Sequence, residues 1–205
     1  MKKKLTILLV FAILSCFTAC TDKQSQTNHS QTEQKTTSNK KKEFSLGHTK
    51  DNIYENEFIG IGFTLPENWS FFTEEQMQER NADTNIIYDM GASDTLGNSI
   101  SITMEKINSS ASSNASEETY IKASAESLKE SLNKMGFSKI EVDTIHVDLA
   151  GEKHLAVDAV CANSQLTIYE KIVCKKVEQY MVTITIGAVV TNETDTILNQ
   201  FYSLD

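Results

Sequence analysis

The alternation of apolar and polar residues predicts strands from residue 52 onward. Ile59, Ile61, Phe63 and Leu65 alternate with small or polar residues, and a period of two is typical of a half-buried strand. We predict a short strand over 52–58 before it, and a turn at Pro66, whose fixed φ suits the opening of a turn. Similar patterns predict strands over 86–92, 98–107, 139–142, 144–149, 153–161, 166–175 and 178–188. The short connections among the last five require antiparallel pairing.

Helical spacing appears in three segments. Thr73–Gln76 matches a capping box and predicts a short helix. Ser116 is a good N-cap, and Gly136 is a suitable C-cap for the long helix between them. Its apolar residues recur at steps of four and three: Ile121, Ala125, Leu128, Leu132 and Met135. A closing helix is predicted over 195–202. We therefore expect an α+β fold, with an antiparallel sheet of about six to seven strands flanked by helices, as a single domain over 51–205.

Residues 1–19 have the pattern of a bacterial lipoprotein signal peptide. Lys2, Lys3 and Lys4 precede an uncharged stretch that is shorter than the roughly 20 residues needed by a spanning helix. Thr18 and Ala19 are small residues before Cys20, which we predict to be the lipidated residue. The alternatives are lipidation at Cys16 and a retained membrane anchor. Two acyl chains on Cys20 would hold the protein stably on the extracytoplasmic side of the cell membrane.

The segment that follows Cys20 is poor in apolar residues. Ser, Thr, Gln, Asn and Lys dominate as far as Lys50, and such a composition cannot bury enough surface to order the chain. We expect residues 20–50 to form a lipidated cysteine and a disordered tether.

Charge restricts the partners that are expected. Removal of residues 1–19 takes away three of the 19 basic residues and none of the 28 acidic ones, which leaves a net charge near −12. So negative a surface argues against nucleic acid as a partner. Two further cysteines, Cys161 and Cys174, are expected to be buried free thiols, because the predicted strand pairing places them too far apart for a disulfide.

The order of elements, together with Gly62-Phe63-Thr64-Leu65-Pro66-Glu67-Asn68-Trp69, resembles the PsbP/Mog1-like proteins, which include lipoproteins of the LpqN and DcrB type. A helix opening at Ser116 and antiparallel strands centred on an Ala150-Gly151 turn extend the resemblance over about residues 52–205. It implies an α/β/α sandwich and an accessory, assembly or binding role, and it transfers no catalytic residue.

A hairpin over 144–161 carries the polar residues that could bind a metal. If its apolar residues share one face, His146, Asp148 and His154 share the other. His154 then lies opposite His146 with a three-residue loop, or opposite Asp148 with a five-residue loop. Two imidazoles and a carboxylate at that spacing suit Zn²⁺ or another transition metal. The alternative is a solvated or hydrogen-bonded sheet face.

Trp69 and Phe72 lie beside the first turn and could form a platform for a ligand, although aromatic residues there also suit the core. No catalytic or dinucleotide-binding motif is present, and no cofactor is predicted. We therefore expect a non-enzymatic lipoprotein with a binding or assembly-accessory domain, whose partner is an envelope protein or a small ligand. The alternative is a solute- or metal-binding module feeding a transporter.

Overall fold

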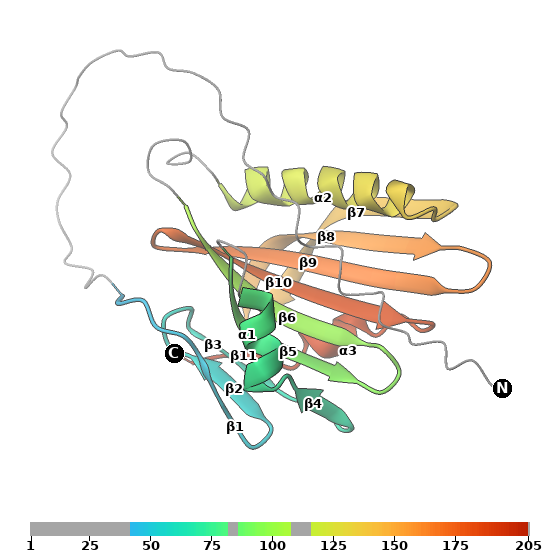
Figure 1. The fold of residues 1–205 in the computed structure, drawn as a ribbon. Coiled ribbons are helices and arrows are strands. Elements are labelled where there is room, and N and C mark those ends of the chain that lie inside the picture. The colour runs from blue at the N-terminus through green and yellow to red at the C-terminus, as the bar shows by residue number, and fades with distance from the viewer. Residues whose placement is uncertain (1–41, 82–85, 108–115, 205) are drawn as a thin grey trace, which may run out of the picture.

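The computed structural model describes residues 42–81, 86–107 and 116–204, and Figure 1 shows their arrangement. Seven antiparallel strands form the main sheet in the order β4-β5-β6-β10-β9-β8-β7. Their bounds are β4 Trp69–Phe71, β5 Ile86–Asp94, β6 Ser99–Lys106, β7 Lys139–Leu149, β8 Glu152–Ala162, β9 Thr167–Val177 and β10 Tyr180–Val189. The predicted α+β class and the size of the sheet are confirmed.

A second, smaller sheet was not predicted. Its order is β1-β2-β3-β11, and its bounds are β1 His48–Lys50, β2 Ile53–Asn56, β3 Ile61–Thr64 and β11 Phe201–Ser203. Two expectations are corrected here. Residues 42–50, assigned to the tether, already belong to the domain, because Phe44 stacks on Tyr180 with ring centroids 4.5 Å apart. The closing helix is α3, Thr194–Leu198, and β11 follows where the prediction continued the helix.

Both faces of the main sheet are covered. Helix α2, Glu117–Lys134, packs on β7, β8 and β9, and its buried residues include Ile121, Leu128 and Leu132. The small sheet and α3 share a second apolar core with the opposite face of the main sheet. Helix α1, Glu74–Asn81, lies against β5 (Figure 1). Among the described residues, no helix is long and apolar enough to cross a membrane.

The predicted helix caps are confirmed. Ser116 Oγ accepts the backbone N–H of Thr119 at 3.1 Å, and Gly136 follows the end of α2 with φ of 80°. That left-handed conformation is open to glycine without strain, which is why the helix ends there.

Strand β9 contains two buried ionisable side chains, which its sequence pattern did not predict. Glu170 and Lys171 are adjacent, so they lie on opposite faces, and both are buried. Lys171 pairs with Asp158, 3.4 Å away, and with Asp195 of α3. Burial raises the pKa of Glu170 to about 7.

The prediction of free cysteines is confirmed. Cys161 and Cys174 are buried thiols on the face covered by α2. Burial raises the pKa of Cys161 to about 11 and that of Cys174 to about 12. Because the thiolate is the reactive form, both are inert structural residues.

Candidate functional site

A groove of about 390 Å³, here called the α1 groove, lies between α1, β5 and the segment around β1. Its volume falls within the range of small-molecule sites, about 300–1,000 Å³. One part of the lining is apolar and comes from all three elements: Leu46, Phe71, Phe72, Met77 and Met90.

Helix α1 is held in place by polar contacts at its two ends, since none of its eight described residues is buried. At its start, Thr73 N donates to Gln76 Oε1 at 2.9 Å, and Gln76 N donates to Thr73 Oγ1 at 3.3 Å, which confirms the predicted capping box. At its end, the Asn81 amide accepts from Tyr88 N at 2.7 Å and donates to Tyr88 O at 3.3 Å. Asn81 thereby fastens the helix to β5.

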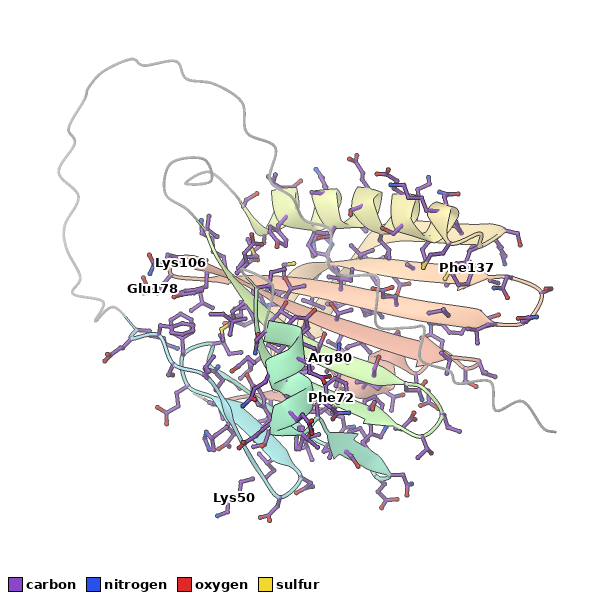
Figure 2. The ribbon with its side chains drawn as sticks, viewed as in Figure 1. Lys50, Phe72, Arg80, Lys106, Phe137 and Glu178 are labelled. Carbon is purple, nitrogen blue, oxygen red and sulfur yellow. The ribbon has the colours of Figure 1, made fainter. Side chains whose placement is uncertain are left out.

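The ring of Phe72 forms a wall of the groove because β5 has a glycine beneath it. A Cβ at Gly91 would lie 2.2 Å from Phe72 Cδ2, closer than any real contact. The guanidinium of Arg80 lies over the same ring, 4.8 Å from its centroid; both residues are labelled in Figure 2. Phe72 is therefore held in place by contacts with both the β5 backbone and the cation of Arg80.

Asp89 lies at the floor of the groove, where the register between β5 and β6 shifts. Its carboxylate accepts Gly47 N–H at 2.8 Å, the Tyr54 hydroxyl, and Asn56 Nδ2 at 2.7 Å. Burial, followed by the charge of Asp89, raises the pKa of Tyr54. Both oxygens of Asp89 are thus occupied in joining the small sheet to the main sheet.

The polar groups left for a ligand lie at the rim of the groove. They include the carboxylate of Glu74, the amide of Gln78 and the hydroxyl of Thr49. Among the described residues that line the groove there is no lysine, arginine or histidine. Apolar walls with negative charge at the rim suit a neutral or positively charged amphipathic molecule.

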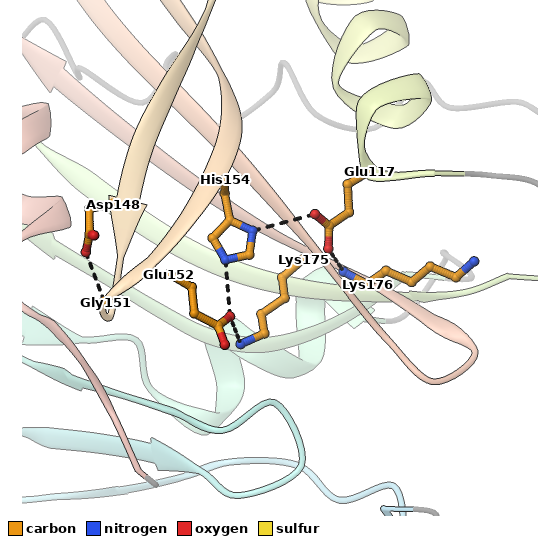
Figure 3. Close-up of polar contacts among 7 residues, drawn as sticks. All are labelled: Glu117, Asp148, Gly151, Glu152, His154, Lys175 and Lys176. Atoms are coloured by element: carbon orange, nitrogen blue, oxygen red, sulfur yellow. Dashed lines mark hydrogen bonds and ion pairs between the residues drawn. The ribbon is translucent and has the colours of Figure 1, made fainter. Parts of the chain in front are cut away.

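A second polar arrangement surrounds His154, which is 7% exposed (Figure 3). Its Nδ1 lies 3.6 Å from Glu117 Oε2, and its Nε2 lies 3.5 Å from Glu152 Oε2. Lys175 approaches Glu152 to 2.9 Å and holds the pKa of that carboxyl below its usual range. The four side chains form an alternating row of charges when the imidazole is protonated.

The role of this row is to clamp α2 onto the sheet. The pairing of β8 with β9 runs only as far as Ala156 and Val173, and beyond it Glu117 Oε1 accepts the backbone N–H of Lys176 at 2.6 Å. Since Glu117 is in the first turn of α2, its carboxylate ties the helix start to β8 and β9 together.

The hollow beside this row measures about 270 Å³ and joins a second one of about 290 Å³ through shared lining residues Lys42, Phe58 and Glu178. Both are smaller than the α1 groove. Their rims mix lysines and glutamates, so they have no single charge preference.

The structure does not bring His146, Asp148 and His154 together as predicted. Leu149 pairs with Glu152, so the loop has two residues, and His146 lies opposite Leu155 while His154 lies opposite Val147. Because neighbours along a strand point to opposite faces, the two histidines are on different sides of the sheet. Asp148 accepts the N–H of Gly151 at 2.9 Å and serves the turn.

The register differs because β7 and β8 place their apolar residues in different cores. Ile145 and Val147 pack in the core beneath the small sheet, whereas Leu155 and Val157 pack beneath α2. The two carboxylates near His154 contact different ring nitrogens, so they cannot meet on one ion. Among the described residues, no group of three or more His, Cys, Asp or Glu side chains is arranged to hold a metal.

The two aromatic candidates are separated. Phe72 lines the α1 groove, while half-buried Trp69 packs against the core and is not part of its lining. The lining residue Glu74 was not singled out as a ligand-binding residue from the sequence. A signal for Glu74 existed in the capping box, which placed it on the first turn of a helix next to Phe72.

Comparison with known proteins identifies the fold. No family model matches the chain, and no curated protein matches it in sequence. Among solved structures, it is similar to CyanoP, the cyanobacterial PsbP of Synechocystis sp. PCC 6803, with a TM-score of 0.50 and 12% identity over 78% of this chain and 98% of that one. LpqN, a Mycobacterium tuberculosis protein involved in cell envelope biogenesis, gives a TM-score of 0.44 and 12% identity over 69% of this chain and 82% of its own. The resemblance indicated by the sequence is confirmed at the level of the fold: this chain has a PsbP-like fold.

Proposed function

We propose that this chain is an extracytoplasmic lipoprotein, anchored through Cys20, whose PsbP-like domain binds a ligand and does not catalyse a reaction. The observation that carries the proposal is the α1 groove, with its volume of about 390 Å³ and its apolar lining. The more buried of its two carboxylates, Asp89, accepts three hydrogen bonds from the protein, which leaves it poorly placed to act as a general base. The groove therefore fits binding better than proton transfer.

The ligand class follows from the rim. Glu74 and Asp89 contribute negative charge to the lining, and the basic side chain of Arg80, which is not a lining residue, lies over the ring of Phe72. A carboxylate or phosphate ligand would be repelled, whereas an apolar ligand with an amine could place its charge at Glu74. We propose a neutral or cationic amphipathic solute, which the anchored domain would hold at the membrane surface.

The binding part is tested by a nuclear magnetic resonance titration of the mature chain with Cys20→Ser, which removes the lipid. Phenethylamine and phenylacetate are matched in shape and differ in charge. We expect the amine to shift signals of Phe72, Met77 and Gly91, and the acid to shift them at least tenfold less at equal concentration. Equal shifts for both probes, or shifts that lie elsewhere, would contradict the proposal.

Two neighbouring glutamates provide the matched variants. Glu74 lines the groove and Glu75 does not. Glu74→Gln should remove the preference for the amine, because it removes the rim charge, and Glu75→Gln should leave it unchanged. If both variants behave alike, the preference does not come from the groove.

The anchor is tested separately by mass spectrometry of the protein purified from its native cell. The expected N-terminal residue is Cys20 carrying diacylglycerol. Cys20→Ser should abolish the modification, and Cys16→Ser should leave it intact. An N-terminus at Met1, or one without lipid, would refute the anchor without affecting the test of the groove.

A further inference from the structure

Two apolar side chains project into solvent at one end of the main sheet. Leu96, in the turn between β5 and β6, is 71% exposed, and Val190, just after β10, is 74% exposed. The loops that carry them are in contact, since Val189 N donates to Asn98 Oδ1 at 2.9 Å. We refer to Leu96 and Val190 as the distal patch.

Val190 is unusual in its backbone as well as in its exposure. Its φ is 69°, a left-handed conformation that is a true outlier for a β-branched residue. The conformation is held because Val190 N donates to Thr167 O at 3.0 Å. Glycine at this position would avoid the strain, and the exposed side chain of Val190 adds nothing to the stability of the fold. The presence of valine therefore points to a function of its side chain.

The turn that carries Leu96 is rigid. Asp94 Oδ1 accepts the backbone N–H groups of Leu96, Gly97 and Asn98 at 2.8, 2.8 and 2.9 Å. Side chains on so fixed a frame lose little conformational entropy when they are covered by a partner.

The patch lies at the end of the sheet opposite the start of the described chain. Lys42 and Phe44 lie beside Tyr180, at the beginning of β10, while Val190 follows its last residue. At about 3.3 Å per residue, a strand of this length separates the two ends by roughly 30 Å. Figure 1 shows the start of the coloured chain and the β5–β6 turn on opposite sides of the domain. The patch therefore lies at the end of the domain remote from Lys42, where the described chain begins.

The surroundings of the patch are acidic. Loop residues 93–98 and 189–195 include Asp94, Glu193 and Asp195 and contain no lysine, arginine or histidine. Asp195 pairs with Lys171 of β9, which leaves the negative charges of Asp94 and Glu193. This negative charge would repel anionic lipid headgroups. It would also repel a second copy of this chain, which carries the same charge on the same surface. A complementary surface is apolar at its centre and basic at its rim.

We propose that the distal patch is a docking surface for a second protein that carries an apolar pocket bordered by lysine or arginine. Leu96 and Val190 fill the pocket, and Glu193 faces its basic rim. The inference does not depend on the α1 groove, which has a different lining.

The test places the photoreactive residue p-benzoylphenylalanine at position 96 of the full chain in its native cell. We expect one protein adduct, which Val190→Asp reduces at least tenfold. The same probe at Met135, an apolar residue that is 40% exposed at the end of α2, should not give this adduct. The adduct partner is then identified and purified, and its affinity for this protein is measured by calorimetry at 50 and 300 mM NaCl.

Binding should weaken at least tenfold with Val190→Asp, weaken with Glu193→Lys, and weaken at the higher salt concentration. Val190→Gly separates a loss of binding from a loss of folding, because it should raise the thermal unfolding midpoint while it lowers the affinity for the partner. An adduct only with a second copy, an adduct only with lipid, the absence of an adduct, or affinity unchanged by Val190→Gly would each overturn the proposal.

Discussion

Glu170 provides a direct test of how the main sheet and α2 fit together. Its side chain is 7% exposed on the face of β9 that also carries Ile168 and Ile172 beneath α2. Burial raises its pKa from 4.5 to about 7. We predict that Glu170→Gln stabilises the protein at neutral and alkaline pH.

The sign follows from proton linkage. The folded state binds the proton more tightly than the unfolded state, so stability falls as the pH rises from about 4.5 to about 7 and the full penalty applies above that. Each unit of pKa difference corresponds to about 1.4 kcal/mol, which gives a penalty of about 3 kcal/mol at pH 8. Below pH 4.5 the glutamic acid is neutral in both states, and the penalty disappears.

Urea unfolding followed by the fluorescence of the single tryptophan, Trp69, measures this free energy. We expect the difference between Glu170→Gln and the unchanged protein to grow by about 3 kcal/mol between pH 4.5 and pH 8. Glu126→Gln, on the exposed face of α2, is the control and should show no such growth. A difference that is independent of pH would refute the burial of a titrating carboxyl at this position.

Three further changes test the contacts that build the groove and the clamp, all by the free energy of unfolding. Asp89→Asn should destabilise the domain by about 2–3 kcal/mol, because three donors lose a charged acceptor; a smaller effect than 1 kcal/mol would mean that the two sheets are joined otherwise. Gly91→Ala should cost about 1–3 kcal/mol and displace the ring of Phe72, which chemical shifts of that ring would report. Glu117→Ala should cost about 1–2 kcal/mol through the lost contacts to His154 and β9, whereas Glu118→Ala, which removes only an exposed pair with a lysine, should have a much smaller effect. Equal effects would contradict the clamp.

Elements with local signals could be predicted from the sequence. The caps at Thr73, Ser116 and Gly136 depend on hydrogen bonds and φ values within a few residues, and the structure has all three. The longer strands were also predicted from their apolar patterns, although β7 was predicted as two strands, and β1, β4 and β11 were not predicted as strands. The antiparallel pairing of β7 to β10 followed from their short connections.

Properties that depend on the partner of an element could not be predicted. Both faces of the main sheet are covered, so the period of two does not tell which core receives a given set of residues, and the register of His146 and His154 was wrong for that reason. Phe201 fits a helix by spacing, but it pairs with Phe63 in β3, with the two rings 4.8 Å apart, and so the chain leaves α3 after Leu198. Glu170 is buried by α2, which ends more than 30 residues earlier in the sequence, so no local sequence pattern indicates that it is buried.

Strand β5 connects the α1 groove with the distal patch. Whether binding at one site changes the affinity at the other therefore depends on whether β5 can change its arrangement. Tyr88 and Asp89 line the groove at one part of β5, and Asp94 at its end holds the turn that carries Leu96. Because β5 is paired with β4 on one side and β6 on the other, we expect it to have no second arrangement that a ligand could select. Coupling between two sites requires such a second state. We therefore expect the affinity of the docking partner to be the same, within about twofold, with and without phenethylamine in the groove.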